Sequence, residues 1–537
     1  DPGLLSQVSP HLGDTGAALQ RLKALDIIYP EGATSDYVFK HVLLRDTVYQ
    51  SLLAESRSKL HLDIAKALEL RNANNLPEAA ETLAHHYSQT DRADLAFKYN
   101  ALAGVKSLGV FSLDQANHYF DAALALYERE ADCASDGAFA EFLGNYALCL
   151  NISLDVMTMI RVAPRVRPIL LRIGDNGDHV LFLHHYVSCL VGNSRFIEAQ
   201  EVQRELTEMA KRLGDPKSIA YAMVNELSVS IYRSALSNAE FEAKRTEVES
   251  ALAKFNDAYL QNFYLATIGW NELTRGRVVK ARETAERMVE LGERTNDPRA
   301  LGYGTAMKAL VAVVTDDQQK ALEFSDEACR LSRVEFEIAI AESSRVAALI
   351  ALEKPGALAM AQDYVRMREA DGCTLFAGVP QSMVGVGLAM EGRVSEGLSQ
   401  IENTIRNRET EGALIAADWN RLLLSEVYLQ ILTGEGGASL QVLFRNFRAL
   451  MGVMLSGEKR IRSLIAKVRQ NPQFDEDGHY FARGEMILGL LCKLKKRKAQ
   501  AREHLATAQR LIAPTGASPT SSRRCTSPSA SRTDCRP

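Results

Sequence analysis

The residues of this sequence that could carry chemistry are few, and most lack the partners that a site needs. Histidines stand at 85–86, 179 and 184–185. Side chains of adjacent helix residues point about 100° apart, and no carboxylate or thiol joins these histidines at metal-ligand spacing. We therefore interpret them as solvated or core residues, and the sequence predicts no metal site.

The other chemical motifs are incomplete or absent. The acidic run Asp475–Gly478 resembles the start of a calcium loop, but Met486 stands where the loop needs its final glutamate, so we interpret the run as an acidic turn. There is no Gly-Lys dipeptide and hence no P-loop, and HExxH and GxSxG are missing. The basic run 493–502 has no interleaved aromatic residue for base stacking. We predict no catalytic residue and no activity for this chain alone.

Composition narrows the class of protein further. The 537 residues carry a net charge of −4 and are 46% hydrophobic, which gives no reason to expect binding to nucleic acid or to an anionic membrane. No apolar run approaches the roughly 20 residues that cross a bilayer. The eight cysteines lie far apart without a CxxC pair, which favours reduced thiols and a cytoplasmic location. We expect Asp1 to lie inside a longer protein.

The segment 27–69 holds the only β-strand signal in the sequence. Two short β-rich runs surround a loop with Gly32 and Asp36, and from Val42 the apolar period changes from about 2 to about 3.6. With the helical residues 18–25 before it, this pattern predicts the back half of a winged helix. His41 stands at the junction of strand and helix.

From about residue 78 to residue 515 the sequence predicts helix after helix. A polar turn, a small residue and an amphipathic helix recur, for example in 276–298 and 316–333, and the spacing from Ala281 to Ala321 indicates a period of about 40. A small residue lets the two helices of a repeat cross closely. The predicted small anchors are Ala199, Ala281, Ala321, Ala359 and Gly397.

These observations predict an all-α fold, an α-solenoid of tetratricopeptide-like helical hairpins preceded by a winged-helix remnant with one β-hairpin. The segment 104–123 fits tetratricopeptide spacing best, through Gly104, Ala116, Phe120 and Ala123. A protein partner or effector is expected on the concave face of the solenoid. The residues after 520 lack large aliphatic side chains, which predicts a disordered tail or a shifted reading frame. The predicted parts are 1–45 (winged-helix half), 46–130 (linking helices and first repeat), 131–516 (solenoid) and 517–537 (tail).

The segment 37–69 resembles the region that follows the nucleotide-binding module in bacterial STAND-type ATPases. Their common form reads F-x-F-x-H-x-L-x-x-x-x-Y-x-x-L and then R-x-x-L-H-x-x-I-A-x-x-L-E. The residues that fit are Phe39, His41, Leu43, Tyr49, Leu52, Arg57, Leu60, His61, Ile64, Ala65, Leu68 and Glu69. Two groups share this plan: class III adenylate/guanylate cyclases fused to an AAA/STAND ATPase and a tetratricopeptide region, and ATP-dependent transcription activators.

The segment 440–518 is similar to the closing region of proteobacterial members of the cyclase group. The resemblance implies a regulatory and protein-interaction region, with ATPase and cyclase domains before Asp1 that bind ADP or ATP. It also implies that His41 contacts the β-phosphate of ADP, as the histidine of a Met-His-Asp motif does, although Val42 replaces the aspartate. A structural role for His41 in fixing the hairpin to the helix stays open. So do two other parents, a STAND transcription activator and a free-standing tetratricopeptide scaffold.

Overall fold

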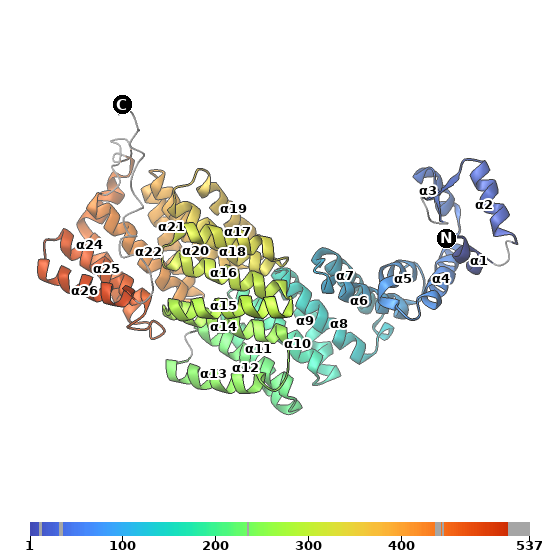
Figure 1. Cartoon of the computed structure of the whole chain (residues 1–537), viewed down its shortest axis with the longest axis horizontal. Helices are drawn as coiled ribbons and strands as arrows, with labels where there is room; N and C mark the ends of the chain where they lie inside the picture. The colour runs from blue at the N-terminus through green and yellow to red at the C-terminus, as the bar shows by residue number, and fades with distance from the viewer. Residues whose placement is uncertain (10–12, 32–35, 234–235, 435–441, 443–444, 514–537) are drawn as a thin grey trace. The chain divides into compact units, whose positions relative to one another are not determined.

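The computed structural model describes most of the chain as helix (Figure 1). The described residues are 1–9, 13–31, 36–233, 236–434, 442 and 445–513. They form 25 α-helices and one two-stranded sheet, so the predicted all-α class is confirmed. The chain divides into two compact units, Asp1–Cys149 and Leu150–Pro537. The predicted tail after residue 516 lies outside the described residues.

The first unit begins with two helices, a hairpin and a third helix. These elements are α1 (Pro2–Val8), α2 (Thr15–Ala24), β1 (Ile28–Pro30), β2 (Tyr37–Phe39) and α3 (Val42–Ser51). The strands pair antiparallel, with Ile28 opposite Phe39 and Pro30 opposite Tyr37. The β-hairpin and the helix after it are therefore where the sequence predicts them. The loop residue Gly32 lies outside the described residues.

Helical hairpins make up the rest of the first unit. They are built from α4 (Ala54–Arg71), α5 (Ala80–Tyr87), α6 (Ala93–Gly109), α7 (Leu113–Arg129) and α8 (Asp136–Ile152), with short 3-10 turns at Leu76–Ala79 and Ala131–Cys133. The tetratricopeptide spacing has a clear physical role here. Ala116, Phe120 and Ala123 are fully buried, and a β-carbon on Gly104 would lie 2.5 Å from the Phe120 ring. Only glycine lets α6 approach that ring so closely.

The second unit is also built from helical hairpins. Its helices are α9 (Val156–Ile173), α10 (Gly177–Gly192), α11 (Phe196–Leu213), α12 (Pro216–Arg233), α13 (Asn238–Leu252), α14 (Ala258–Arg275), α15 (Val278–Thr295), α16 (Pro298–Val314), α17 (Gln318–Leu331), α18 (Glu335–Ala351), α19 (Ala357–Ala370), α20 (Thr374–Met390), α21 (Val394–Thr410), α22 (Leu414–Thr433), α24 (Phe447–Arg469), α25 (His479–Leu494) and α26 (Lys498–Ile512).

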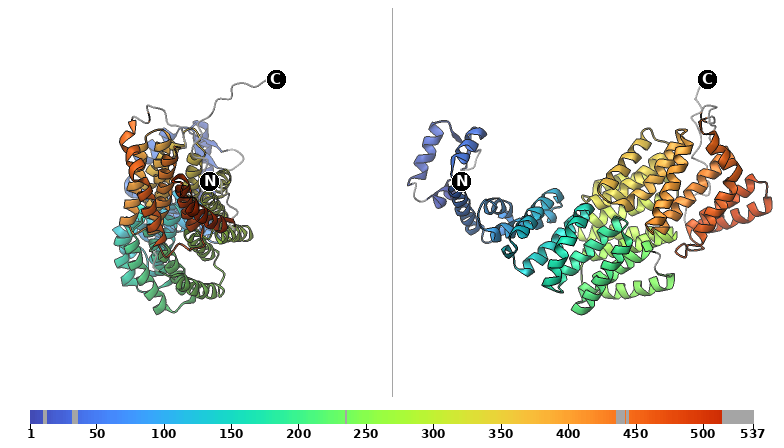
Figure 2. Two further views of the ribbon diagram at one scale, coloured as in Figure 1. Left: turned by 90° about the vertical axis from the view of Figure 1, so that its left-hand side faces the viewer. Right: turned by 180° about the vertical axis from the view of Figure 1, so that it is seen from behind.

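Consecutive helices of this unit pack as antiparallel pairs that stack side by side (Figures 1 and 2). The first helices of successive pairs also contact one another, from α10 through α12, α14, α16, α18 and α20 to α22. These first helices begin at residues 177, 216, 258, 298, 335, 374 and 414, which confirms the predicted period of about 40. The second unit is an α-solenoid of tetratricopeptide-like hairpins.

The predicted small anchors lie at the helix crossings, with one exception. Ala199, Ala281 and Ala321 are fully buried, and each is the fourth residue of its helix. Gly397 holds the same place in α21, where a β-carbon would lie 2.3 Å from the Gly385 carbonyl oxygen. The prediction for Ala359 is wrong, because its side chain is exposed.

The error at Ala359 is one of register along α19. This helix begins at Ala357, directly after Gly356, which adopts a left-handed conformation with φ +78°. Ala361, the fifth residue of α19, is fully buried and takes the place of the anchor. The helix start therefore decides which of several nearby alanines faces the neighbouring helix.

The solenoid also contacts itself between hairpins far apart in sequence. Asn193, after α10, donates a hydrogen bond to the Gly372 carbonyl, before α20, at 2.5 Å. Gln473, after α24, donates one to the Ile231 carbonyl of α12 at 3.1 Å. Helix α12 also contacts α22. Later repeats of the solenoid therefore contact earlier repeats directly, in addition to their neighbours in sequence.

Candidate functional site

His41 lies at the strand-to-helix junction that the sequence indicates. It is the N-cap residue of α3, its side chain is exposed, and it makes no capping hydrogen bond. Its backbone carbonyl accepts from the Leu44 and Arg45 amides. The amides of a helix N-terminus favour an anion, so the position suits a phosphate contact. The predicted ADP contact of His41 stays a prediction.

The helix that follows His41 leaves its apolar side chains exposed to solvent. None of the ten residues of α3 is buried. Leu43 is 81% exposed, and Val42, Val48 and the following Leu53 are also exposed, as is Phe39 on β2. A ten-residue helix is marginal in water and normally gains its stability from packing of an apolar face. The apolar side chains of β2 and α3 therefore form a surface that another protein surface could cover.

A second candidate site is a cavity in the layer of first helices of the second unit. Residues of α10, α12, α14, α16 and α18 line it, together with the end of α8 and one residue of α20. Its volume is about 90 Å³. The aromatic wall consists of Trp270, Tyr303 and Phe336. The Trp270 indole donates a hydrogen bond to the Tyr303 hydroxyl at 2.7 Å, and the Tyr303 and Phe336 rings stack with centroids 6.0 Å apart.

The side chains of Arg299 and Glu337 line this cavity. The Arg299 guanidinium donates two hydrogen bonds to the Asp297 carboxylate, at 3.0 and 2.8 Å, and lies over the Tyr259 ring. Burial raises the pKa of Glu337 to about 8, although the positive charge of Arg299 acts in the opposite direction. Glu337 therefore carries a proton at neutral pH, and its carboxyl group can donate a hydrogen bond.

One polar atom of the cavity lacks a partner. The Asn262 Oδ1 atom is buried and accepts no hydrogen bond from any part of the chain that the structure describes. A buried acceptor without a donor is costly, so a water or a ligand group is expected there. With the aromatic wall and the protonated Glu337, the cavity suits a neutral group that both packs and hydrogen-bonds. Its volume matches a single side chain rather than a whole cofactor.

The sequence did not single out these cavity residues. Glu337 lies between Phe336 and the apolar run 338–341, and an acidic residue flanked by apolar positions of a helix is a signal that could have marked it. His184 and His185 lie behind the cavity, near the Tyr259 hydroxyl at 3.3 and 3.5 Å. Burial lowers the pKa of His184 to about 3, so its ring is neutral. With His179, which is also buried, they are core histidines.

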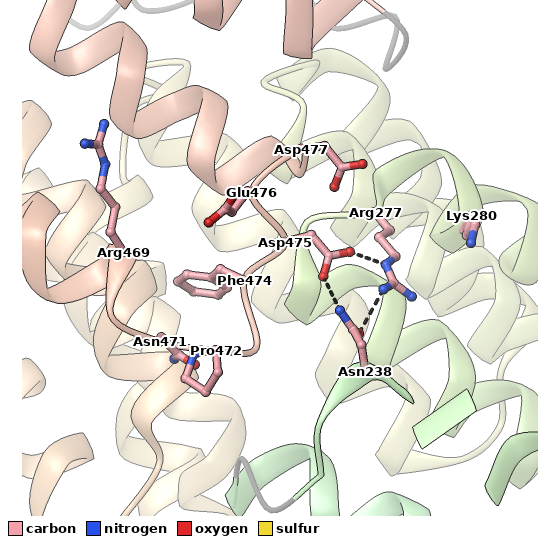
Figure 3. A pocket seen from close by; sticks show the side chains of 10 residues that line it. All are labelled: Asn238, Arg277, Lys280, Arg469, Asn471, Pro472, Phe474, Asp475, Glu476 and Asp477. Carbon is pink, nitrogen blue, oxygen red and sulfur yellow. Dashed lines mark hydrogen bonds and ion pairs between the residues drawn. The ribbon is translucent and has the colours of Figure 1, made fainter. Parts of the chain in front are cut away.

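The acidic run Asp475–Gly478 joins two parts of the solenoid (Figure 3). The Asp475 carboxylate pairs with Arg277 and accepts a hydrogen bond from Asn238 at 2.9 Å. The His479 amide donates to the Gly276 carbonyl at 2.9 Å, and this approach requires glycine, since a β-carbon on Gly276 would lie 2.9 Å from that amide. A surface hollow of about 560 Å³ lies beside this contact.

The acidic turn that the sequence predicts therefore has a structural use. We call the contact of 471–479 with Asn238, Arg275, Gly276 and Arg277 the clasp. The Asp475 carboxylate forms an ion pair with Arg277 and accepts a hydrogen bond from Asn238, so the acidic run makes contacts within the protein.

No described helix is long and apolar enough to cross a membrane.

Comparisons with known proteins identify no family for this chain. No family model matches the sequence, and no curated protein matches it. Among solved structures, the Rap protein complexed with Competence and Sporulation Factor is similar, with a TM-score of 0.42 and 13% sequence identity. The similarity covers 63% of this chain and 91% of the Rap chain. The fold assignment rests on the helices and repeats themselves.

Proposed function

We propose that this chain is the regulatory and protein-interaction region of an adenylate-cyclase-like signalling ATPase of the cytoplasm. The helical repeats bind a protein partner or effector. The N-terminal hairpin and α3 transmit that event to ATPase and cyclase domains of the same polypeptide. The observation that carries this proposal is the exposed apolar surface of β2 and α3, together with the resemblance of residues 37–69 to STAND ATPases.

In this proposal an upstream domain covers the exposed apolar side chains of β2 and α3. Leu43 and Leu53 are 81% and 76% exposed, and side chains of this size bring roughly 1.5–3 kcal/mol each when fully buried. A covering domain would supply the packing that α3 lacks. In this proposal His41 lies beside the nucleotide of the upstream module, as the histidine of the Met-His-Asp motif does in STAND ATPases.

The test uses the full-length protein and its bound nucleotide. The variant His41→Leu should purify with less ADP and show a higher basal output, because one contact to the β-phosphate is lost. The matched control is His118→Leu, an exposed histidine on α7. Nucleotide content and thermal stability are measured on all three proteins. Unchanged ADP occupancy in His41→Leu, or lost occupancy together with a collapsed melting temperature, would contradict the nucleotide role.

The partner is expected to reach the inner layer of the solenoid. The cavity beside Trp270 and Glu337 has room for one neutral side chain, about 90 Å³, and offers the unpartnered Asn262 acceptor. A partner that inserts such a side chain would contact five or more repeats at once. This arrangement would change how the repeats stack, and so pass a signal along them.

Two alternatives remain distinct from the cyclase parent: a STAND transcription activator and a free-standing scaffold. The chain alone should form no cyclic nucleotide and should not bind double-stranded DNA at physiological salt. Lys40, the only cation of the hairpin segment 27–41, forms an ion pair with Asp26, which leaves little charge for phosphate neutralisation. The sequence of the upstream reading frame distinguishes these three classes of protein. A cyclase domain there favours the cyclase group, a DNA-binding domain favours the transcription activator, and neither favours the scaffold.

A further inference from the structure

Three imidazole rings meet where α4 packs against α5. His61 comes from α4, and His85 and His86 come from the last turn of α5. One ring nitrogen from each of the three lies within 4.8 Å of the others. The His61 and His86 Nδ1 atoms are 2.8 Å apart. The three ring centroids are 5.0 to 5.8 Å apart in pairs.

The second nitrogen of His61 is held by another side chain. The His61 Nε2 atom forms a hydrogen bond with the Tyr49 hydroxyl at 2.8 Å. This bond directs Nδ1 toward His86. Histidines that bind metals almost always donate their other N–H to such a partner, which fixes the tautomer and the orientation of the ring. Tyr49 therefore stands where a supporting residue of a metal site is expected.

His61 is buried and His86 is half-buried, whereas His85 is exposed. Burial lowers the pKa of His86 to about 4 and lowers the pKa of His61, with smaller contributions from the neighbouring histidines. Metal binding needs the neutral imidazole. One of the two facing Nδ1 atoms carries the proton of their hydrogen bond, and for both atoms to bind a metal that proton must move to the Nε2 atom of the same ring. The Arg57 guanidinium, which lies over the Tyr49 ring, is the nearby positive charge that opposes binding.

We propose that His61, His85 and His86 form a binding site for zinc or a neighbouring divalent transition metal. Tetrahedral zinc with nitrogen ligands at about 2.0–2.1 Å requires ligand atoms about 3.3 Å apart. The His61 and His86 Nδ1 atoms are closer than that value and all three ligand atoms lie within 4.8 Å of one another, so small ring rotations would complete the site. His85 is exposed, which leaves the fourth position to water or to a group from a partner.

The ligand set decides the class of metal. Three imidazoles without a carboxylate favour zinc, cobalt, nickel or copper over magnesium and calcium, which prefer oxygen. His85 and His86 are adjacent on α5, yet their ring centroids lie 5.3 Å apart and both rings lie within 5.8 Å of the His61 ring. A bound ion would join α4 to α5 at the start of the helical hairpins.

The experiment is a cobalt titration of the metal-free chain 1–537, followed by displacement with zinc. The wild type should bind one equivalent of cobalt with the visible bands of imidazole ligation. The variants His85→Ala and His86→Gln should each bind roughly 100-fold more weakly or worse. Tyr49→Phe should weaken binding about tenfold, since it removes only the support of His61. Zinc should raise the melting temperature of the wild type and leave that of the two histidine variants unchanged.

The matched control is His118→Ala, an exposed histidine of the same unit, which should bind as the wild type does. His85 is exposed, so His85→Ala tests the site without disturbing the core. Circular dichroism verifies the fold of each variant. Absence of stoichiometric cobalt binding by the wild type would overturn the proposal. So would histidine variants that bind as tightly as the wild type, or a spectrum dominated by thiolate charge transfer.

Discussion

The helix α3 and the helices of the second unit have opposite relations to their surroundings. α3 has no buried residue, whereas α15 alone buries seven, among them Ala281 and Met288. Both helices carry apolar side chains, so the difference lies in what covers these side chains. A repeat helix is covered by its neighbours in the same chain. The apolar face of α3 is left for another surface, which is the basis of the proposed coupling role.

The largest expected effect of this difference is on hydrogen exchange. In the chain alone, amides of α3 should exchange at least roughly 1,000-fold faster than amides of α16, because local opening costs little where nothing is buried. Exchange measured by mass spectrometry or NMR tests this directly. Equal protection of the two helices would show that α3 is covered within this chain.

The second effect concerns the helix crossings of the repeats. Ala281→Leu or Ala321→Leu should overpack the crossing and cost roughly 1–3 kcal/mol. Because repeats contact mainly their neighbours, the loss of protection should stay within adjacent hairpins. The matched control is Ala359→Leu, which lies on the same kind of helix but is exposed. A uniform loss across the chain would argue for a single cooperative core.

The third effect is a pH dependence of stability that arises from Glu337 in the cavity. The pKa of Glu337 is raised from 4.5 to about 8 in the folded state. The stability from its protonated form is fully present below pH 4.5 and is lost as the pH rises to about 8. Glu337→Gln cannot ionise, so relative to wild type it should gain roughly 1–4 kcal/mol between pH 5 and pH 8. Urea unfolding at both pH values measures this. If the free energies of unfolding of the two proteins differ by the same amount at pH 5 and at pH 8, Glu337 is already ionised in the folded protein at pH 5.

The fourth effect is on the clasp. Asp475→Asn keeps the size of the side chain but removes the charge that pairs with Arg277, and both residues are largely buried. We expect a loss of roughly 1–2 kcal/mol, confined to α24, α25 and the hairpins they contact. Limited proteolysis near residues 471–479 should become faster. Asp477→Asn, on the same loop, is the control, and equal effects of the two substitutions would contradict a specific role for Asp475.

The smallest effect returns to α3. Leu43→Lys in the chain alone should change stability by less than about 0.5 kcal/mol, because the side chain is already in water. Thermal unfolding followed by circular dichroism verifies this. A larger loss would reveal packing of Leu43 that its exposure does not suggest.

The parts of the fold that depend on local residue types could be predicted from the sequence. The repeat period and the anchors at Ala281 and Ala321 follow from small residues at fixed places in amphipathic helices. The prediction of an anchor at Ala359 is wrong because α19 begins directly after Gly356. This is an error of register along the helix, which periodicity alone does not determine.

Contacts between distant residues could not be predicted. Asn193 meets Gly372 across almost 180 positions, and neither residue carries a pattern that marks the other. The meeting of His61 with His85 and His86 depends on the turn between α4 and α5. The sequence shows the adjacent pair but not the third ring. The cavity around Glu337 is of the same kind, since five first helices assemble it.

The central claim, that a covering domain couples α3 to nucleotide state, is tested most directly by hydrogen exchange of residues 42–51 in two proteins. The full-length protein with bound ADP is compared with the chain 1–537 under identical conditions. The account predicts that these amides are protected at least about 100-fold more in the full-length protein, because an upstream domain buries the apolar face of α3. Equal exchange in the two proteins would contradict it.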